Sequence, residues 1–196
     1  DVYKRQILDG ISAAIRYNLG PVKVNCVVQR GVNEYQIPKL VRKFRGTGVI
    51  VRFIEFMDVG STNGWTQGQV VPTSEIIDFL SSEFDLIPLA RKSASDVASR
   101  WAHSDDSGEI GFISSVSQPF CGDCVRARLS SDGKFFTCLF TTTGHDMSAL
   151  IKSGGKTEVL TQSIEEVWSA RKDRYSEERP SVAISLPRVE MSYIGG

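Results

Sequence analysis

The sequence predicts an α/β fold whose first half is built from parallel β/α units. Residues 22–29 and 49–56 are two apolar segments with the composition of buried strands, and each follows a segment with helical periodicity. A helix between two such strands is the usual connection of a parallel pair. The second half differs, because it carries three cysteines around a predicted hairpin.

Composition excludes several classes of protein. The chain is 41% hydrophobic and 23% charged with a formal net charge of zero, so any anion site must be local. The sequence contains no apolar run of membrane-spanning length and shows no signal peptide. Its four cysteines favour metal chemistry in a reducing compartment, and the cytoplasm is the expected location.

The helices of the first half have recognisable limits. Helical spacing of apolar residues is established by Ile7 and stops at the Leu-Gly-Pro sequence of residues 19–21. Asn33 is the expected cap of a second helix, which Gly46 and Gly48 end. Two strands alone cannot form a covered parallel sheet. Later strands must join them, or part of the fold lies upstream, and the opening helix favours the second explanation.

Alternation along the strands separates a core face from a polar face. Cys26 shares a face with three valines and is expected to be a core thiol. Lys23 and Asn25 lie on the other face, and Arg52 interrupts the apolar run of the next strand. Basic residues on successive parallel strands predict an anion-binding site at the sheet.

The segments that follow are less regular. Residues 58–69 form a glycine-rich loop after a strand, but they lack both a Walker lysine and a G-x-G-x-x-G sequence. Thr73 is expected to cap a helix, residues 93–107 to form a loop or short edge strands, and residues 109–117 to form a strand. Helices are expected from residue 147 and over 157–170, with Leu160, Ile164, Val167 and Trp168 inward. The charged run 171–179 is typical of a solvated face.

The cysteines Cys121, Cys124 and Cys138 have C-x2-C-x13-C spacing. Asp132-Gly133 is a strong hairpin signal that would fold residues 134–138 back beside residues 126–130 and bring the third thiol to the first two. Three thiolates suit zinc with a fourth ligand, or a four-iron cluster with one open iron. A disulfide is less consistent with this sequence.

Two arginines follow the second cysteine. Arg126 and Arg128 are two residues apart and should share one face of a strand. Guanidinium groups beside an open iron would suit an anionic ligand such as a phosphate.

Together, these motifs resemble a known family. They are Pro-Val-Lys-Val-Asn at 21–25, Arg-Gly-Val-Asn at 30–33, Val-Arg-Phe-Ile-Glu-Phe-Met at 51–57, Asn-Gly-Trp at 63–65, Cys-Gly-Asp-Cys-Val-Arg-Ala-Arg at 121–128, Asp-Gly-Lys at 132–134, Thr-Cys-Leu-Phe at 137–140 and Gly-Gly at 195–196. The combination resembles the carboxyl-terminal part of the GTP 3',8-cyclase family, radical S-adenosylmethionine enzymes of molybdenum cofactor biosynthesis. The likeness runs from about residue 7 to the end, and residues 1–6 fit it poorly.

The resemblance implies the carboxyl-terminal half of a partial β/α barrel followed by an α+β iron–sulfur extension. Residues 1–90 would belong to the barrel, and residues 91–196 to the region that holds an auxiliary [4Fe–4S] cluster and GTP. The family's first cluster cleaves S-adenosylmethionine, and the resulting radical abstracts the 3' hydrogen of GTP before the ribose attacks guanine C8. Its C-x3-C-x2-C motif is absent from this sequence, so this chain alone is expected to be inactive.

The resemblance also assigns residues. Cys121, Cys124 and Cys138 would hold the auxiliary cluster, and a homodimer is compatible with the family. The expected GTP contacts are Lys23, Arg126, Ala127 and Arg128. Met57 would contact S-adenosylmethionine. The catalytic assignments are Arg52 and the terminal Gly195 and Gly196, a tail that enters the active site.

Two alternatives remain open from the sequence. One is the auxiliary-cluster half of another radical enzyme, against which the two arginines and the terminal diglycine argue. The other is a zinc-stabilised binding module without catalysis, which metal content would distinguish. No nucleic acid polymer or membrane is expected as a partner.

Overall fold

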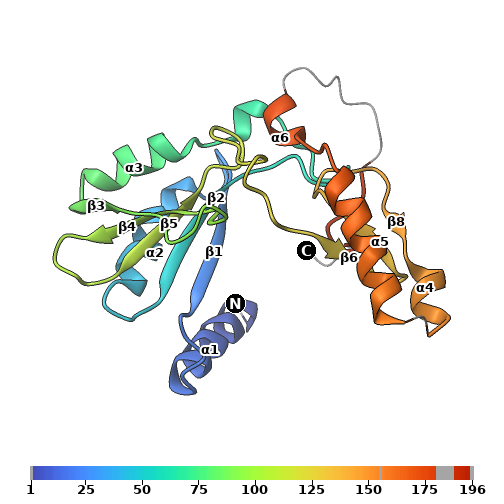
Figure 1. Ribbon diagram of the computed structural model, residues 1–196. Helices are drawn as coiled ribbons and strands as arrows, with labels where there is room; N and C mark the ends of the chain where they lie inside the picture. The colour runs from blue at the N-terminus through green and yellow to red at the C-terminus, as the bar shows by residue number, and fades with distance from the viewer. Residues whose placement is uncertain (1, 155, 180–187, 195–196) are drawn as a thin grey trace. The chain divides into compact units, whose positions relative to one another are not determined.

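The computed structural model describes residues 2–154, 156–179 and 188–194. The chain divides into two compact units, one of residues 1–56 and 67–118 and the other of residues 57–66 and 119–196. Figure 1 shows the elements of both units. The assignment of residues 1–90 and 91–196 to separate functional regions stays a prediction.

The first unit is built on a five-stranded mixed sheet (Figure 1). Its order is β1-β2-β5-β4-β3, with β1, β2 and β5 parallel and with β4 and β3 antiparallel to their neighbours. The strands are β1 (Lys23–Val28), β2 (Ile50–Glu55), β3 (Leu86–Leu89), β4 (Ser99–His103) and β5 (Glu109–Ile113). The α/β prediction is confirmed, and later strands do join the first two. No strand was expected at β3. Residues 93–107 were expected to form a loop or short edge strands, and this is wrong for β4, which pairs with both β3 and β5 and is an inner strand of the sheet.

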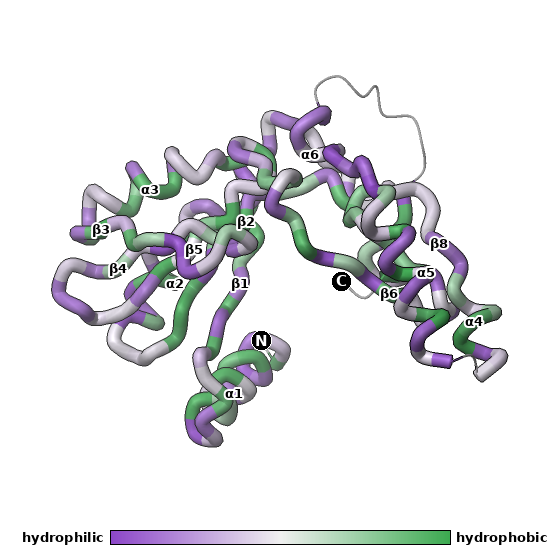
Figure 2. Tube along the Cα trace, viewed as in Figure 1, coloured by the Kyte–Doolittle hydropathy of each residue, from purple (hydrophilic) through white to green (hydrophobic). Residues whose placement is uncertain are grey.

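The helices of this unit are α1 (Val2–Arg16), α2 (Ile37–Phe44) and α3 (Thr73–Ser81), with short 3-10 turns η1 (Glu34–Gln36) and η2 (Gln67–Gln69). Their apolar side chains pack with those of β2 and β5 into one core, which includes Ile37, Val41, Phe53, Leu80 and Phe112. Figure 2 shows hydrophobic residues on the helices α1, α2 and α3 as well as on the strands. Burial of the apolar face of the sheet stabilises it through the hydrophobic effect.

Two predicted helix caps are wrong. The Asn33 side chain makes no capping bond; its Oδ1 accepts from the Gln29 amide at 2.8 Å and its Nδ2 donates to the Val27 carbonyl at 2.8 Å. Asn33 therefore closes the loop after β1. Thr73 is the first residue of α3, and its backbone amide donates to the carboxylate of Glu55. An acceptor from a distant strand thus satisfies the amide that a local cap would have satisfied.

The second unit contains a small antiparallel sheet of β6 (Arg128–Leu129), β7 (Lys134–Phe136) and β8 (His145–Asp146). Its helices are α4 (Ser148–Lys152), α5 (Thr157–Ala170) and α6 (Tyr175–Glu178). The predicted hairpin is confirmed, because β6 pairs with β7 and Gly133 takes the left-handed conformation, φ +88°, that the turn needs.

Helix α5 has the predicted limits but a shallower contact face. The residues expected inward are half-buried, and the residues on the opposite side of the helix are exposed. The half-buried residues are Leu160, Ile164, Val167 and Trp168. None of the described residues of α5 is fully buried. Among the described residues, no helix has the length and apolar character needed to span a bilayer.

Candidate functional site

The first two cysteines lie in a tight turn of the second unit. The Cys124 amide donates to the Cys121 carbonyl at 3.2 Å, and the Gly122 amide donates to the carboxylate of Glu177 at 3.3 Å. Both thiols are half-buried. The turn predicted from the C-x2-C spacing is therefore present, and the Glu177 carboxylate of α6 stabilises it by accepting a hydrogen bond from its backbone.

The hairpin delivers the third cysteine to the same region. Cys138 follows β7, and its Sγ accepts from the Phe140 amide at 3.5 Å. Burial raises the pKa of the Cys138 thiol, and negative charge on Cys121 and Cys124 raises it further. The convergence of the three thiols that the hairpin signal predicted stays a prediction.

Arg126 is directed at the second thiol. Its Nη2 lies 3.4 Å from Cys124 Sγ, and its guanidinium stands over the Phe120 ring at 5.0 Å. Burial alone would raise the pKa of Cys124, but the Arg126 amide and guanidinium outweigh it, so the pKa is lowered. The thiolate, which is the form that binds metals, is thereby favoured at Cys124.

Arg128 begins β6 and is half-buried, whereas Arg126 precedes the strand and is exposed. Burial lowers the pKa of Arg128, and the charge of Arg126 lowers it further, so the two guanidinium groups influence each other. The prediction that they share a strand face fails, because the strand does not reach Arg126. Ala127 between them is exposed.

The thiols are not arranged as a closed metal site. In the part of the chain that the structure describes, no three His, Cys, Asp or Glu side chains are grouped as a metal ion would require. The donors themselves suit a thiophilic metal or an iron–sulfur cluster, since all three are cysteines and the pKa of one of them, Cys124, is lowered. The residues fit such a group by their chemistry.

The residues of the predicted anion site in the first unit line a pocket on the polar face of the sheet. Its volume is about 270 Å³, and its lining includes Lys23, Arg52, Lys92, Arg100 and Glu109. Arg100 is bound to Glu109 through two contacts of 2.8 and 2.7 Å. Lys23 and Arg52 are thus brought to one pocket, as the strand alternation predicted, and Lys92 is a further cation that the sequence had not suggested.

Met57 is half-buried, and its carbonyl accepts from the Asn63 side chain at 3.0 Å. Gly195 and Gly196 lie outside the described residues. The residues just before them are packed in the second unit: Ile194 is buried, and the Tyr193 hydroxyl donates to Asp132 at 2.7 Å.

Comparison with known families decides the classification. Residues 49–177 match the family model described as Molybdenum Cofactor Synthesis C. The chain belongs to this family. The match covers β2 through α5, including all three cysteines of the hairpin region.

Curated relatives of this member of the molybdenum cofactor synthesis C family are named GTP 3',8-cyclase. The protein of Xanthomonas axonopodis pv. citri is 49% identical over 97% of the chain, which covers 57% of the relative. The Staphylococcus carnosus protein is 43% identical, with 97% and 57% covered. The Acidothermus cellulolyticus protein is 40% identical, with 100% and 61% covered. The chain therefore matches only part of each enzyme.

Sequence reasoning missed a buried ionic network in this family member. Asp58 Oδ1 accepts from Arg179 Nε at 3.0 Å, and Asp58 Oδ2 accepts from the Tyr175 hydroxyl at 2.5 Å and lies 2.9 Å from Arg188 Nη1. The side chains of Asp58, Arg179 and Arg188 are 5%, 7% and 7% exposed, so the charges are paired away from water. The expectation that residues 171–179 form a solvated face is therefore wrong for Arg179. The only sign of this network in the sequence was Tyr175, an aromatic residue within the charged run.

Tyr175 gives this network a pH dependence. Burial and the bond to Asp58 raise the pKa of Tyr175 from its usual 10.0 to about 12. Because the folded state holds this proton more tightly, its contribution to stability is complete below pH 10 and is lost as the pH rises to about 12. We expect the free energy of unfolding to fall over this range by more in the parent than in Tyr175→Phe. Chemical denaturation between pH 10 and about 12 measures the free energy of unfolding of the parent and of Tyr175→Phe. An equal fall with pH in the two proteins would contradict the prediction. Tyr35→Phe, at an exposed tyrosine, is the control.

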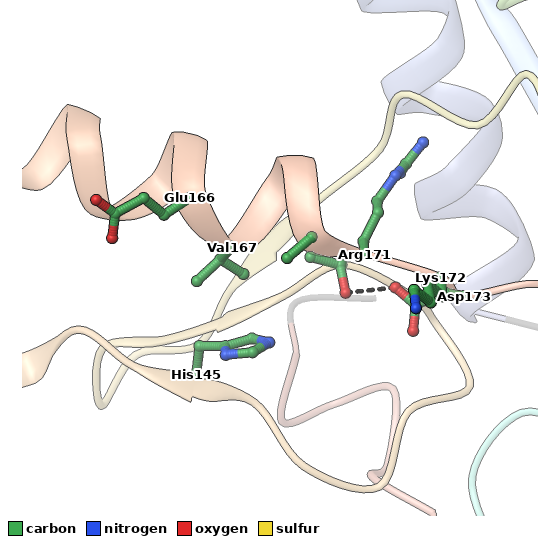
Figure 3. A pocket seen from close by; sticks show the side chains of 8 residues that line it. His145, Glu166, Val167, Arg171, Lys172 and Asp173 are labelled. Carbon is green, nitrogen blue, oxygen red and sulfur yellow. Dashed lines mark hydrogen bonds between the residues drawn. The ribbon is translucent and has the colours of Figure 1, made fainter.

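A second pocket lies between α5 and the small sheet, with a volume of about 470 Å³. Figure 3 shows His145 on its strand facing Val167 on α5, with Arg171, Lys172 and Asp173 at the helix end. The Thr137 hydroxyl donates to Asp173 at 2.6 Å, and an Arg171 guanidinium nitrogen donates to the Cys124 carbonyl. The end of α5 is therefore tied to the cysteine segment on both sides of the hairpin.

Proposed function

We propose that this chain is the substrate-binding part of a GTP 3',8-cyclase. The complete enzyme would convert GTP into (8S)-3',8-cyclo-7,8-dihydroguanosine 5'-triphosphate by radical S-adenosylmethionine chemistry in molybdenum cofactor biosynthesis. The observation that carries the proposal is the Cys124–Arg126 pair, in which a thiol with a lowered pKa is joined to an exposed guanidinium. It occurs within the segment shared with relatives of that name.

In this proposal, Cys121, Cys124 and Cys138 hold a [4Fe–4S] cluster. When bound, such a cluster supplies an open iron to which a guanine nitrogen or oxygen can bind. Arg126, Ala127 and Arg128 form the adjoining GTP contact. Their support is the contact of the Arg126 guanidinium with Cys124 Sγ, the influence of the Arg126 charge on Arg128, and the absence of a salt bridge to either arginine among the described residues.

Lys23 and Arg52 are proposed to hold the triphosphate. Their support is the cationic pocket on the polar sheet face, where Arg100 is neutralised by Glu109 while Lys23 and Arg52 have no carboxylate bound to them in the described chain. Charge-assisted bonds from such groups are the usual means of holding phosphates. Met57 is proposed to contact S-adenosylmethionine, and Gly195 with Gly196 to complete the active site.

The chain alone is proposed to be inactive, because it contains no C-x3-C-x2-C motif to generate the radical. Turnover of GTP by this chain with S-adenosylmethionine and a reductant, and nothing else added, would overturn that part of the proposal. A homodimer and a cytoplasmic location remain expectations from the family.

The metal is tested by anaerobic reconstitution with iron and sulfide. We expect about four irons per chain, and a loss of most of this iron in Cys138→Ala. Cys26→Ala is the matched control, because Cys26 is a half-buried thiol of β1 in the other unit and should leave iron content unchanged. A colourless protein with one zinc would instead support a zinc-stabilised binding module.

GTP binding by the reconstituted chain is the second test. Removing a guanidinium that bonds a phosphate or guanine should weaken binding at least about tenfold in Arg126→Ala. Arg42→Ala is the control, because Arg42 is an exposed arginine of α2 that pairs with Glu83. Titration calorimetry with GTP and with ATP measures affinity and base selectivity. Binding that is unchanged in Arg126→Ala would contradict the assignment.

A further inference from the structure

The polar face of the first unit carries an ordered row of residues across four strands. The strand register pairs Asn25 of β1 with Arg52 of β2, and Arg52 with Gly111 of β5. Gly111 in turn pairs with Arg100 of β4. The strand neighbours of this row, such as Phe53 and Phe112, point to the apolar core on the other face.

Gly111 leaves the space in which the Arg52 side chain lies. A Cβ at Gly111 would stand 2.9 Å from Arg52 Cγ and 3.3 Å from Arg52 Cδ. The first distance is well inside van der Waals contact, so an alanine here would displace the arginine stem. Gly111 does not have a positive φ. Its backbone conformation is therefore open to any residue, and the close approach of Arg52 is the physical reason for a glycine in this buried strand.

Asn25 fixes the other end of the arginine. Arg52 Nε donates to Asn25 Oδ1 at 2.8 Å. Because this bond uses Nε, the two terminal nitrogens of the guanidinium stay available for a ligand. A long side chain that is held at its stem and at Nε loses less freedom when it binds an anion, which strengthens binding.

The surrounding charge favours an anionic ligand. The pocket contains the cations Lys23, Arg52 and Lys92 in addition to the paired Arg100 and Glu109. Its other carboxylate, Asp96, is occupied by the backbone amides of Lys92 and Ser93, at 2.9 and 3.1 Å. The lining therefore holds four cations against two carboxylates, and this excess of positive charge suits a polyphosphate.

We propose that Asn25 and Gly111 are positioning residues that hold the Arg52 guanidinium in this pocket for a polyphosphate group. The inference rests on the proposed function, in which Lys23 and Arg52 bind the triphosphate of GTP. It adds the residues that set the geometry of that contact. Neither Asn25 nor Gly111 touches the ligand, and both act through Arg52.

The test is the affinity of the chain for inorganic tripolyphosphate and for GTP, measured by titration calorimetry. We expect at least about tenfold weaker binding in Arg52→Ala, a loss of similar size in Gly111→Ala, and a smaller loss in Asn25→Ala. Gly68→Ala is the matched control, because a Cβ at Gly68 meets nothing within 4 Å. Circular dichroism and thermal unfolding confirm that each variant is folded.

The double variant Arg52→Ala/Gly111→Ala separates positioning from general damage. If Gly111 acts through Arg52, the double variant binds no more weakly than Arg52→Ala alone, so the two losses are not additive. Additive losses, or parental affinity in Gly111→Ala, would overturn the inference and leave the proposed function standing. Parental affinity in Arg52→Ala, or no binding of either ligand by the parent, would overturn the proposed phosphate contact and this inference together.

Discussion

Replacing Glu55 by glutamine is expected to lower the free energy of unfolding of the first unit by about 3 to 5 kcal/mol. Glu55 is fully buried at the end of β2. Its Oε1 accepts from the Thr73 amide at 2.8 Å and from the Ser117 hydroxyl at 2.5 Å. Its Oε2 accepts from the amides of Val116 and Ser117, both at 2.8 Å. One carboxylate thus accepts hydrogen bonds from the first backbone amide of α3 and from the turn that follows β5.

The size of the effect follows from what glutamine can offer. Its single oxygen can replace only one of the two acceptors, and its NH2 group would face donors that are then left unsatisfied without water. Hydrogen bonds to a buried charged acceptor contribute about 1.5 to 3 kcal/mol each. Losing about two of them gives about 3 to 6 kcal/mol, which contains the predicted range and would be a large part of the stability of a domain.

Urea denaturation of the parent and the variant measures this difference. Glu75→Gln provides the matched control, because Glu75 is an exposed carboxylate of α3 that pairs with Arg30. That surface pair should change stability by no more than about 1 kcal/mol. A Glu55→Gln variant as stable as the control would show that the buried acceptor is replaceable, for instance by entry of water.

The α/β character of the first unit and the two faces of its strands could be predicted from the sequence. The long-range hydrogen bonds that join its elements could not. Alternation placed Lys23 and Arg52 on the polar face, because side chains of a strand must point to opposite sides. The same alternation puts Glu55 on the face of Val51 and Phe53, so its burial could have been predicted. Its donors come from Thr73 and from residues 116–117, and no local pattern specifies which distant amides a carboxylate will meet.

The second unit shows the same limit. The Asp132-Gly133 signal is local, and the hairpin it predicts is present. The buried network of Asp58 and Arg179 joins residues far apart in the chain, so the charged run around Arg179 was interpreted as solvated. The prediction for Arg126 and Arg128 was partly local. Their spacing would place them on one face of a strand, but β6 is too short for both to lie on it. Long-range pairing of polar groups is what the sequence did not specify.

The second large effect is expected at this network. Changing Asp58 to asparagine should destabilise the second unit by about 3 to 5 kcal/mol, because two buried guanidinium groups lose their counter-charge. The asparagine oxygen can accept from one donor, but its NH2 group would face the Tyr175 hydroxyl or an arginine. Arg179 already has one buried nitrogen, Nη2, without a partner in the described chain, so it has little alternative pairing.

Chemical denaturation measures the change, with the fluorescence of Trp65 and Trp168 in a Trp101→Phe background as a probe of the second unit. Glu165→Gln is the control, because Glu165 is an exposed acid of α5 whose replacement should matter by less than about 0.5 kcal/mol. The pH dependence gives an independent check on the same residue. Burial alone would raise the pKa of Asp58, but Tyr175, Arg179 and Arg188 outweigh it and lower the pKa below its usual 3.8.

Since folding lowers this pKa, the contribution of Asp58 to stability is present above pH 3.8 and is lost as the pH falls through the folded-state value. The parent should therefore lose stability in acid by more than Asp58→Asn, and the two should approach each other as the pH is lowered. An asparagine variant that matches the parent at neutral pH would mean that water or a neighbouring group neutralises both guanidinium groups. The carboxylate would then be dispensable to the fold that holds the cysteine turn.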